Sequence, residues 1–227
     1  MTHRVNSHEL DPTALDFMPP KSSSNGMKII PLKYAINGEL KATNHVQIMS
    51  PLVSHWGINS FQSNGPESLA VPFFDGNPDT NAFREKLEAL DERVRQYAFE
   101  NSVQLFGSRK SREVINEFHS PIVKVLPRRS GGGEIAKASF KVENRNNKYS
   151  CELWDKATRT KIFPTEETPT ASPGSYLSRD STIRFHFVID SMWVKGNQFG
   201  LKLIFKSALV STPIATDMGN PFPDDDA

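Results

Sequence analysis

Cationic and aromatic side chains are the residues of this 227-residue sequence whose types could do chemistry together. Rows of Lys and Arg bind phosphates, and flat rings stack on unpaired bases, so a mixture of the two predicts a surface for single-stranded nucleic acid. A solvated lysine or a buried ring is the commoner fate of any one residue. The candidates for such a surface are Arg109, Lys110, Arg128, Arg129, Lys137, Lys141, Trp154, Lys161, Phe163, Arg184, Trp193, Lys195 and Lys202.

The charge of the chain is unevenly distributed. The net charge is only +1, from 27 basic and 26 acidic residues, but no Lys or Arg follows Lys206. Four of the acids lie beyond that point, which leaves 22 acids against 27 bases and gives the body a charge of +5. Residues 211–227 are therefore predicted to be a flexible acidic tail.

The acidic tail combines negative charge with one ring, Phe222, which lies between two prolines. A short peptide of this kind suits a basic, aromatic-lined groove, so the tail is predicted to compete with nucleic acid there and to bind partner proteins. A metal site is disfavoured because consecutive acids in a flexible end rarely converge on one cation. The residues assigned to the tail site are Asp217, Phe222, Asp224, Asp225 and Asp226.

Motifs of enzymes are missing from the sequence. There is no phosphate loop, no dinucleotide fingerprint, no His-Glu-x-x-His and no nucleophile elbow, and the six histidines share no ligand spacing. A triad dispersed along the chain is the alternative, since triads are recognised by geometry. We expect no catalytic residue, no cofactor and no metal.

The single cysteine and the hydropathy pattern limit where the chain resides. Cys151 has no second cysteine to pair with, which favours a reducing compartment. The first residues show no apolar signal core, and no apolar stretch is long enough for a membrane span. These features predict an intracellular protein without membrane contact.

The stretch 181–210 gives the strongest structural pattern. Its first arm alternates Phe185 and Phe187 with Arg184 and His186, and its second arm repeats the alternation, which is typical of half-buried strands. A Gly-Asn pair at 196–197 is a hairpin turn signal. We therefore predict an antiparallel hairpin with a buried apolar face and a basic face exposed.

The remaining elements fall into an order of strands, helices and strands. Apolar residues at spacings of 4, 3, 4 and 3 predict a helix over 80–100, and Ser111 caps a second one over 112–118. Short strands are predicted at 27–34, 45–49, 69–74, 122–126, 136–142, 149–154 and 161–163, with 27–34 and 45–49 as a pair.

This order favours an all-β domain at 27–210, an oligonucleotide-binding (OB) fold of Greek-key barrel type with a helical insertion at about 80–118. An open α+β sheet is the alternative. Residues 1–26 lack periodicity and are predicted to be a flexible leader.

Three stretches also resemble a known family. They are the helix pattern Phe83-x3-Leu87-x2-Leu90-Asp91, the segment SREVINEFHSPIVK at 111–124, and the pattern Trp-Val-x-Gly-x2-Phe-Gly-Leu within 192–210. Over roughly 28–210 the chain resembles the single-stranded DNA-binding proteins of nucleocytoplasmic large DNA viruses of algae and protists. That family is distantly similar to a phage replication protein with an OB-fold barrel and an acidic tail.

The resemblance implies a five-stranded barrel, DNA binding through basic and aromatic residues, no catalytic residue, and a tail that recruits replication enzymes such as a polymerase or helicase. The tail departs from the family pattern, because Phe222 precedes the acids and the chain closes on Ala227. If the protein is viral, it would act in the cytoplasm or nucleus of the host cell. A tail docking on a neighbouring subunit would make a homodimer.

Together these features predict a non-catalytic, sequence-tolerant protein that coats single-stranded DNA in replication, repair or recombination. Two alternatives share the same sequence features. One is an RNA-binding OB-fold protein, and the other is a barrel that holds another protein.

Overall fold

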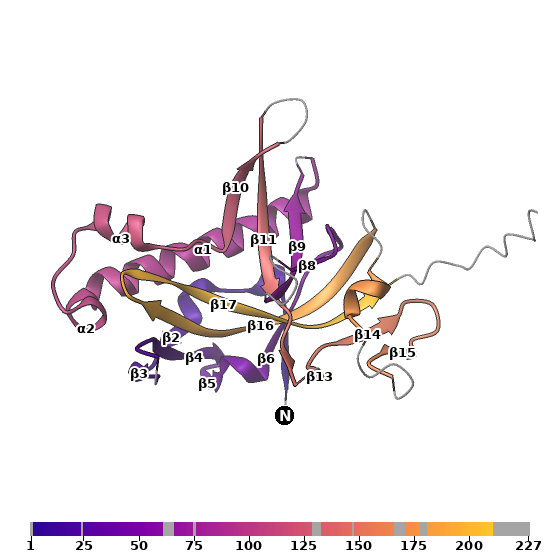
Figure 1. Ribbon diagram of the computed structural model, residues 1–227, viewed down its shortest axis with the longest axis horizontal. Coiled ribbons are helices and arrows are strands. Elements are labelled where there is room, and N and C mark those ends of the chain that lie inside the picture. Colours follow the sequence, from indigo (N-terminus) through magenta and orange to yellow (C-terminus); the bar gives the residue numbers. More distant parts are fainter. Residues whose placement is uncertain are drawn as a thin grey trace, which may run out of the picture.

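A long hairpin is the centre of the computed structural model, which describes residues 2–23, 25–60, 66–74, 76–128, 133–146, 148–165, 171–177 and 181–210. Strand β16 (Thr182–Lys195) pairs antiparallel with β17 (Gln198–Val210) along almost its whole length (Figure 1). Gly196 takes the left-handed φ of 58° that the tight turn requires. The hairpin predicted at 181–210 is confirmed.

Most of the other strands extend the hairpin into one mixed, curved sheet whose main path is β1-β6-β16-β17-β11-β9-β8, and β12 and β13 form a separate two-stranded sheet. The contacts of β17 with β11 and with β14 are parallel, as is that of β1 with β6. The remaining bounds are β1 (His3–Asn6), β2 (Leu15–Phe17), β3 (Lys21–Ser22), β4 (Lys28–Ile36), β5 (Glu39–Ala42), β6 (Val46–Met49), β7 (Val53–Ser54), β8 (Ile58–Ser60), β9 (Glu67–Phe73), β10 (Val123–Pro127), β11 (Glu134–Lys141), β12 (Asn144–Arg145), β13 (Lys148–Tyr149), β14 (Glu152–Asp155) and β15 (Lys161–Phe163). Short 3-10 helices lie at Ser7–Glu9, Pro12–Ala14, Thr43–His45 and Pro173–Tyr176.

Two bulges shape the hairpin. Lys206 is the extra residue between the pairs His186↔Ser207 and Phe187↔Phe205, and Asp190 is the extra residue between Ile189↔Leu203 and Ser191↔Lys202. The apolar side chains that face the core are Ile183, Phe185, Phe187 and Ile189 before Asp190 and Met192 and Val194 after it, so Trp193 stays on the same face as Arg184 and His186. We call this the outer face of the hairpin.

Three helices lie between the two sets of strands, at α1 (Pro78–Glu100), α2 (Ser102–Phe106) and α3 (Arg112–Phe118), which confirms the helices predicted at 80–100 and 112–118. The Asn77 side chain caps α1 by accepting bonds from the backbone N–H groups of Asp79 and Thr80. The apolar stripe of α1 packs on the inner face of the hairpin, where Phe83 lies 5.9 Å from Phe187 between ring centroids. The outer face carries Arg184, His186 and Trp193, whereas Val188 and Ile204 at its middle are buried.

Asp91 ties α1 to the chain after α3. Its carboxylate is buried, lies 3.1 Å from Nε2 of His119, and accepts the backbone N–H of Ile122 at 2.8 Å. A buried carboxylate needs such partners because its charge has no water around it. Helix α1 and the segment 111–124 therefore meet in a structural contact.

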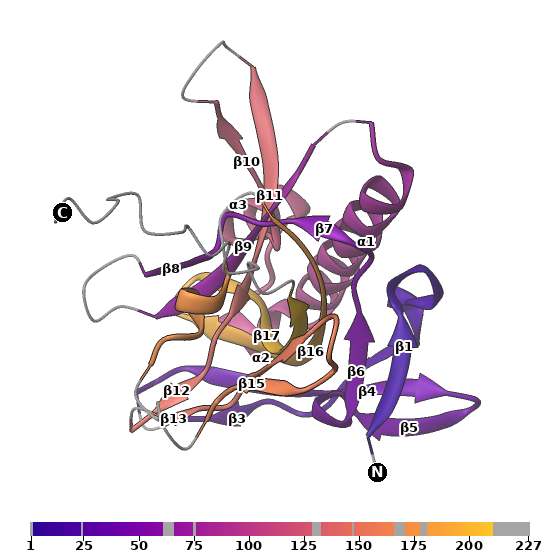
Figure 2. The same cartoon turned by 90° about the vertical axis from the view of Figure 1, so that its right-hand side faces the viewer.

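The described residues 2–23 differ from the flexible leader expected for 1–26. Strand β1 pairs with β6 (Figure 2), β2 and β3 pair with β4, and the side chain of Leu10 is fully buried. These strands have only two to four residues, which is too short for alternation to show in the sequence. Their partners come from distant parts of the chain, which local patterns do not reveal.

The predicted pairing of 27–34 with 45–49 is also wrong. Strand β4 turns at Asn37 and Gly38, both with positive φ, and pairs with β5 instead. A two-residue turn fixes the immediately following segment as the partner. Strand β6 pairs with β1 and β16.

The fold is thus mostly β, with a curled sheet and a helical insertion (Figure 2). The Greek-key order and the five-stranded barrel stay predictions. None of the helices in the described ranges is both long and apolar enough to cross a membrane.

Candidate nucleic-acid interface

A groove with excess positive charge crosses the outer face of the hairpin where β16 begins and β17 ends. Its volume is about 440 Å³, and β1, β6, β14, β16 and β17 all contribute to it. We call it the basic groove. It is lined by Arg4, Gln47, Met49, Ser150, Glu152, Trp154, Arg159, Arg184, His186, Lys206, Ser207, Ala208 and Leu209.

The arginines of the basic groove are not neutralised by any residue that the structure describes. Arg4, Arg159 and Arg184 are exposed, and none of them forms an ion pair with any residue that the structure describes. The one acid of the lining, Glu152, accepts a hydrogen bond from Nε1 of Trp154 at 3.3 Å. A concave surface of this charge attracts anions.

Arg159 is positioned by a turn between β14 and β15 that one carboxylate organises. The Asp155 side chain accepts the backbone N–H groups of Ala157 and Thr158 at 2.8 and 2.7 Å. Arg159 itself has a left-handed φ of 59°, and its N–H donates to the Asp155 carbonyl. The sequence Asp-Lys-Ala-Thr-Arg therefore builds a tight loop of the Asx type that presents a guanidinium at the rim of the basic groove.

His186 lies half-buried on the floor of the basic groove. Its Nδ1 is 3.1 Å from the Ser207 hydroxyl on the neighbouring strand. Burial lowers the pKa of His186 below its usual value, and the nearby charge of Arg4 lowers it further. The imidazole is therefore neutral at pH 7 in the free protein.

Trp154 supplies a flat ring at one wall of the basic groove. It is partly exposed on β14, opposite Leu209 of β17 and Lys161 of β15. Lys161 lies 4.0 Å from Glu152, so its charge is partly compensated. A partly exposed indole beside unpaired arginines is suited to stacking on a base whose phosphates the arginines hold.

A second groove lies further along the outer face, around Trp193. It has a volume of about 750 Å³ and is more apolar, and we call it the tryptophan groove. Its three lysines face two acids, Glu67 and Asp190. It is lined by Met27, Ile29, Pro66, Glu67, Ser68, Lys124, Ser139, Lys141, Asp190, Ser191, Trp193, Leu201, Lys202 and Leu203.

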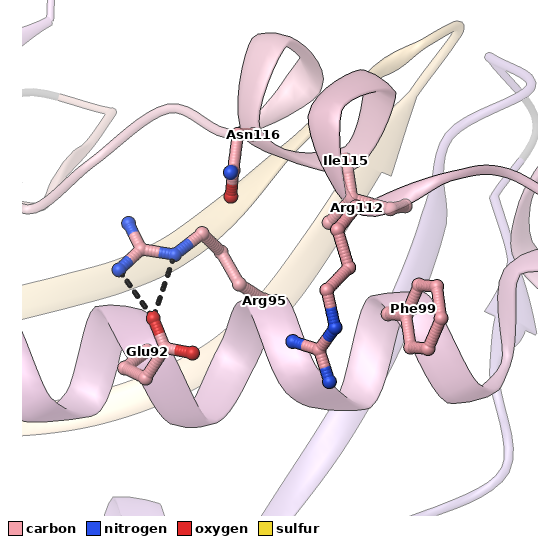
Figure 3. Close-up of a pocket in the computed structure, with 6 residues that line it drawn as sticks. All are labelled: Glu92, Arg95, Phe99, Arg112, Ile115 and Asn116. Atoms are coloured by element: carbon pink, nitrogen blue, oxygen red, sulfur yellow. Dashed lines mark hydrogen bonds and ion pairs between the residues drawn. The ribbon is translucent and has the colours of Figure 1, made fainter.

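A third cluster of cations lies on the helices, but its members are largely engaged. In the helical cleft of Figure 3, Arg95 forms an ion pair with Glu92, and the Arg112 guanidinium lies 4.6 Å from the centre of the Phe99 ring. Arg109 and Lys110 border the adjoining hollow. The helices α2 and α3 lie at the turn end of the hairpin, whereas β14 and β15 lie at its other end (Figure 1).

The sequence candidates are therefore divided among several places. Trp154 and Arg184 line the basic groove, with Lys161 beside it, and Lys141, Trp193 and Lys202 line the tryptophan groove. Lys195 lies exposed beside the hairpin turn, and Lys137 lies partly buried on β11. Arg128 lies at the end of β10, where its Nε donates to the Glu134 carbonyl. Arg129 and the tail residues Asp217, Phe222, Asp224, Asp225 and Asp226 lie outside the described residues.

Phe163 needs a correction, because its side chain is 0% exposed and packs in the core. Successive side chains of a strand point to opposite faces of the sheet, so Phe163, which pairs with the buried Leu153, points into the core, whereas Trp154 points to the groove. Conversely, Arg4, Arg159, His186 and Lys206 line the basic groove without having been candidates. Of these, only His186 and Lys206 could have been identified from the sequence, because the alternation of polar and apolar residues puts both on the polar face of the predicted hairpin.

The described residues contain no group of three or more His, Cys, Asp or Glu side chains that could hold a metal ion. Cys151 is buried, and burial raises the pKa of its thiol to about 12. The thiol is therefore protonated at neutral pH and unreactive.

No protein-family model matches the chain, and no curated protein sequence is similar to it. Among solved structures, the chain is similar to a single-stranded DNA-binding protein from bacteriophage Enc34 in complex with ssDNA. The identity is 8% and the TM-score 0.41, over 86% of this chain and 96% of that chain. Membership of the large-DNA-virus family stays a prediction.

Proposed function

We propose that this protein is a non-catalytic, sequence-tolerant single-stranded DNA-binding protein that holds the strand in the basic groove. The observation that carries the proposal is the placement of three arginines around one groove whose described lining holds one acid and one partly exposed tryptophan. The arginines come from β1, β16 and the turn between β14 and β15, and none has an ion-pair partner among the described residues. Arginines bind phosphates along a track, and the ring stacks on a base.

The geometry favours a single strand over a duplex. In a duplex the bases stack on each other, so Trp154 would have no free base face to meet. Arginine–phosphate contacts and ring stacking also carry little base information, which is why sequence tolerance is expected. A protein of this kind would coat exposed strands during replication, repair or recombination.

The acidic tail enters the proposal as a partner-binding segment. Leu209 lines the basic groove and Val210 ends β17, so the tail leaves the described structure directly beside that groove. We propose that residues 211–227 compete with DNA and recruit a polymerase or helicase. If so, deleting residues 211–227 raises the affinity for single strands. An unchanged affinity would exclude competition with DNA and leave partner recruitment as the one remaining role of the tail.

The first experiment measures binding of a fluorescently labelled single strand at two salt concentrations, with a duplex of the same sequence as the control. We expect affinity to fall with salt by a log–log slope of about 0.7 for each neutralised phosphate. Tight duplex binding without single-strand binding would overturn the proposal.

An RNA strand of the same sequence separates DNA from RNA binding. Gln47 and Ser207 supply polar groups within the basic groove that could meet a 2′-hydroxyl, so RNA is the second candidate ligand. Tighter binding of RNA than of DNA would assign the groove to RNA. A lack of response to either nucleic acid would leave the protein-interaction alternative.

A further inference from the structure

One carboxylate joins the two grooves of the outer face. Lys206 lines the basic groove and Lys202 lines the tryptophan groove. Both lysines reach Glu143, with N–O distances of 3.7 Å for Lys206 and 3.0 Å for Lys202. Lys202 also lies 3.3 Å from Asp190. These four residues, which we call the Glu143 cluster, form the boundary between the grooves.

The bulges of the hairpin create this arrangement. Lys206 and Asp190 are the extra residues of the two bulges, and a bulge redirects the side chain it adds. Burial alone would raise the pKa of Glu143, but the hydrogen bond and charge of Lys202 and the charges of Lys206 and Arg145 hold its pKa below its usual value. The carboxylate is therefore ionised at neutral pH, and two lysines balance two acids.

The Glu143 cluster places an anion at the point where a strand crossing between the grooves would put a phosphate. The side chains of Lys202 and Lys206 remain 29% and 25% exposed, so an incoming phosphate can reach both. A phosphate accepts hydrogen bonds from ammonium groups as a carboxylate does. A DNA phosphate can therefore replace the Glu143 carboxylate as the partner of both ammonium groups.

The tryptophan groove has the features of a base-stacking site. The Trp193 ring lies opposite Gly200, where an added Cβ would come within 3.3 Å of the ring and 2.7 Å of the Ser120 carbonyl oxygen. Glycine at this position therefore lets the ring lie close to β17. Leu201 and Leu203 contribute apolar atoms to the lining, and Lys124 and Lys141 contribute cations.

We propose that the two grooves are successive subsites for one DNA strand, and that a phosphate of the strand displaces Glu143 from Lys202 and Lys206. This inference rests on the proposed function of the basic groove. From Arg184 to Trp193 the hairpin spans about 30 Å, at roughly 3.3 Å for each strand residue. That length suits a strand of several nucleotides, within the range of about 4–16 that one OB fold binds.

Fluorescence of single tryptophans tests the path of the strand directly. A protein with Trp56→Phe and Trp154→Phe reports on Trp193 alone, and one with Trp56→Phe and Trp193→Phe reports on Trp154 alone. We expect an oligonucleotide of about 5 nucleotides to quench Trp154 only, and one of about 20 nucleotides to quench both. Quenching of Trp193 by neither oligonucleotide, or by both equally, overturns the two-subsite path.

Glu143→Gln tests the displacement. Because the variant removes the competing anion from both Lys202 and Lys206, we expect about two- to fivefold tighter binding of the long oligonucleotide, the size of one surface charge pair. The short oligonucleotide should gain less, because it reaches only Lys206. The matched control is Glu85→Gln, which makes the same charge change at an exposed position of α1, the helix on the inner face. If Glu143 were only a brace for the lysines, the variant would weaken binding of both lengths.

The two levels of the proposal fail in different ways. If the wild-type protein binds neither oligonucleotide, the proposed function itself is wrong. If it binds both with equal affinity, and Glu143→Gln behaves as Glu85→Gln does, only the second subsite and the displacement are wrong.

Discussion

The two grooves of the outer face differ in how the protein treats their charges, although one hairpin supplies both floors. The basic groove has arginines from β1, β16 and the β14–β15 turn that no described residue neutralises. The tryptophan groove has Lys202, which already lies within 3.3 Å of two carboxylates. An unpaired cation can bind a phosphate without first losing a carboxylate partner. The basic groove is therefore the primary site, and the tryptophan groove the secondary one.

The largest expected effect comes from reversing the unpaired arginines. The double variant Arg4→Glu and Arg184→Glu replaces two phosphate contacts with two repulsions, and like charges across an interface cost several kcal/mol. We expect binding of every oligonucleotide length to fall by at least about a hundredfold. Fluorescence anisotropy at low salt measures the affinity, and circular dichroism checks the fold.

The matched control is Arg109→Glu with Lys110→Glu, which makes the same charge change at the helical end of the molecule. We expect a much smaller loss there. Equal losses in the two double variants would mean that net charge, rather than the basic groove, determines binding.

The next effect concerns two rings of one strand pair, Trp154 on β14 and Phe163 on β15. Trp154→Ala should cost about 1–3 kcal/mol of binding, because a partly exposed ring is lost from the groove without opening the core. Phe163→Ala should instead cost about 3–5 kcal/mol of stability, because its ring is fully buried. Thermal melts and oligonucleotide titrations of both variants separate the two roles.

Trp154→Phe sharpens this contrast, since a phenyl ring still stacks. We expect it to retain most of the affinity that Trp154→Ala loses. If Trp154→Ala loses its thermal transition instead of its affinity, then Trp154 belongs to the core.

The strong periodic elements of the fold are predictable from the sequence, and the site is predictable only in part. The alternation around Phe185 and the stripe beginning at Phe83 locate the hairpin and α1, because each pattern repeats several times within one element. The exposed position of Arg184 follows from the first of these patterns. The position of Arg4 cannot be predicted in this way, because β1 has only four residues and is placed by its pairing with β6, where the partner of Arg4 is Gln47, 43 positions along the chain.

Two other features of the site also cannot be predicted from local sequence patterns. Trp154 and Phe163 look equivalent in sequence, and only tertiary packing decides which ring is buried. The pairing of Lys202 with Glu143 depends on the two bulges, and these arise from unequal residue counts in the paired strands.

The smallest expected effect is a pH dependence that only the basic groove should show. Within that groove His186 is surrounded by Arg4, Arg184, Lys206 and Glu152, and its pKa in the free protein lies below the usual 6.5 because of burial and the charge of Arg4. A bound phosphate favours the protonated imidazole and raises this pKa, so binding takes up a proton.

Affinity for the short oligonucleotide should therefore be constant at a pH where His186 is neutral in both the free and the bound protein. It should rise as the pH falls through the pKa of the bound state, by at most tenfold for each pH unit, and level off below the lowered pKa of the free protein. Folding stability has the opposite sign. The pKa of His186 is lower in the folded protein than in the unfolded chain, so its neutral form contributes to the stability of the fold fully above pH 6.5, and this contribution is lost as the pH falls. Affinities are therefore compared only at pH values where thermal melts still show a folded protein. His186→Gln keeps a partner for Ser207 but cannot take up a proton, so its affinity should not respond to pH in this window. If the variant retains the full pH response, the proton binds elsewhere, and His186 does not contact the phosphates.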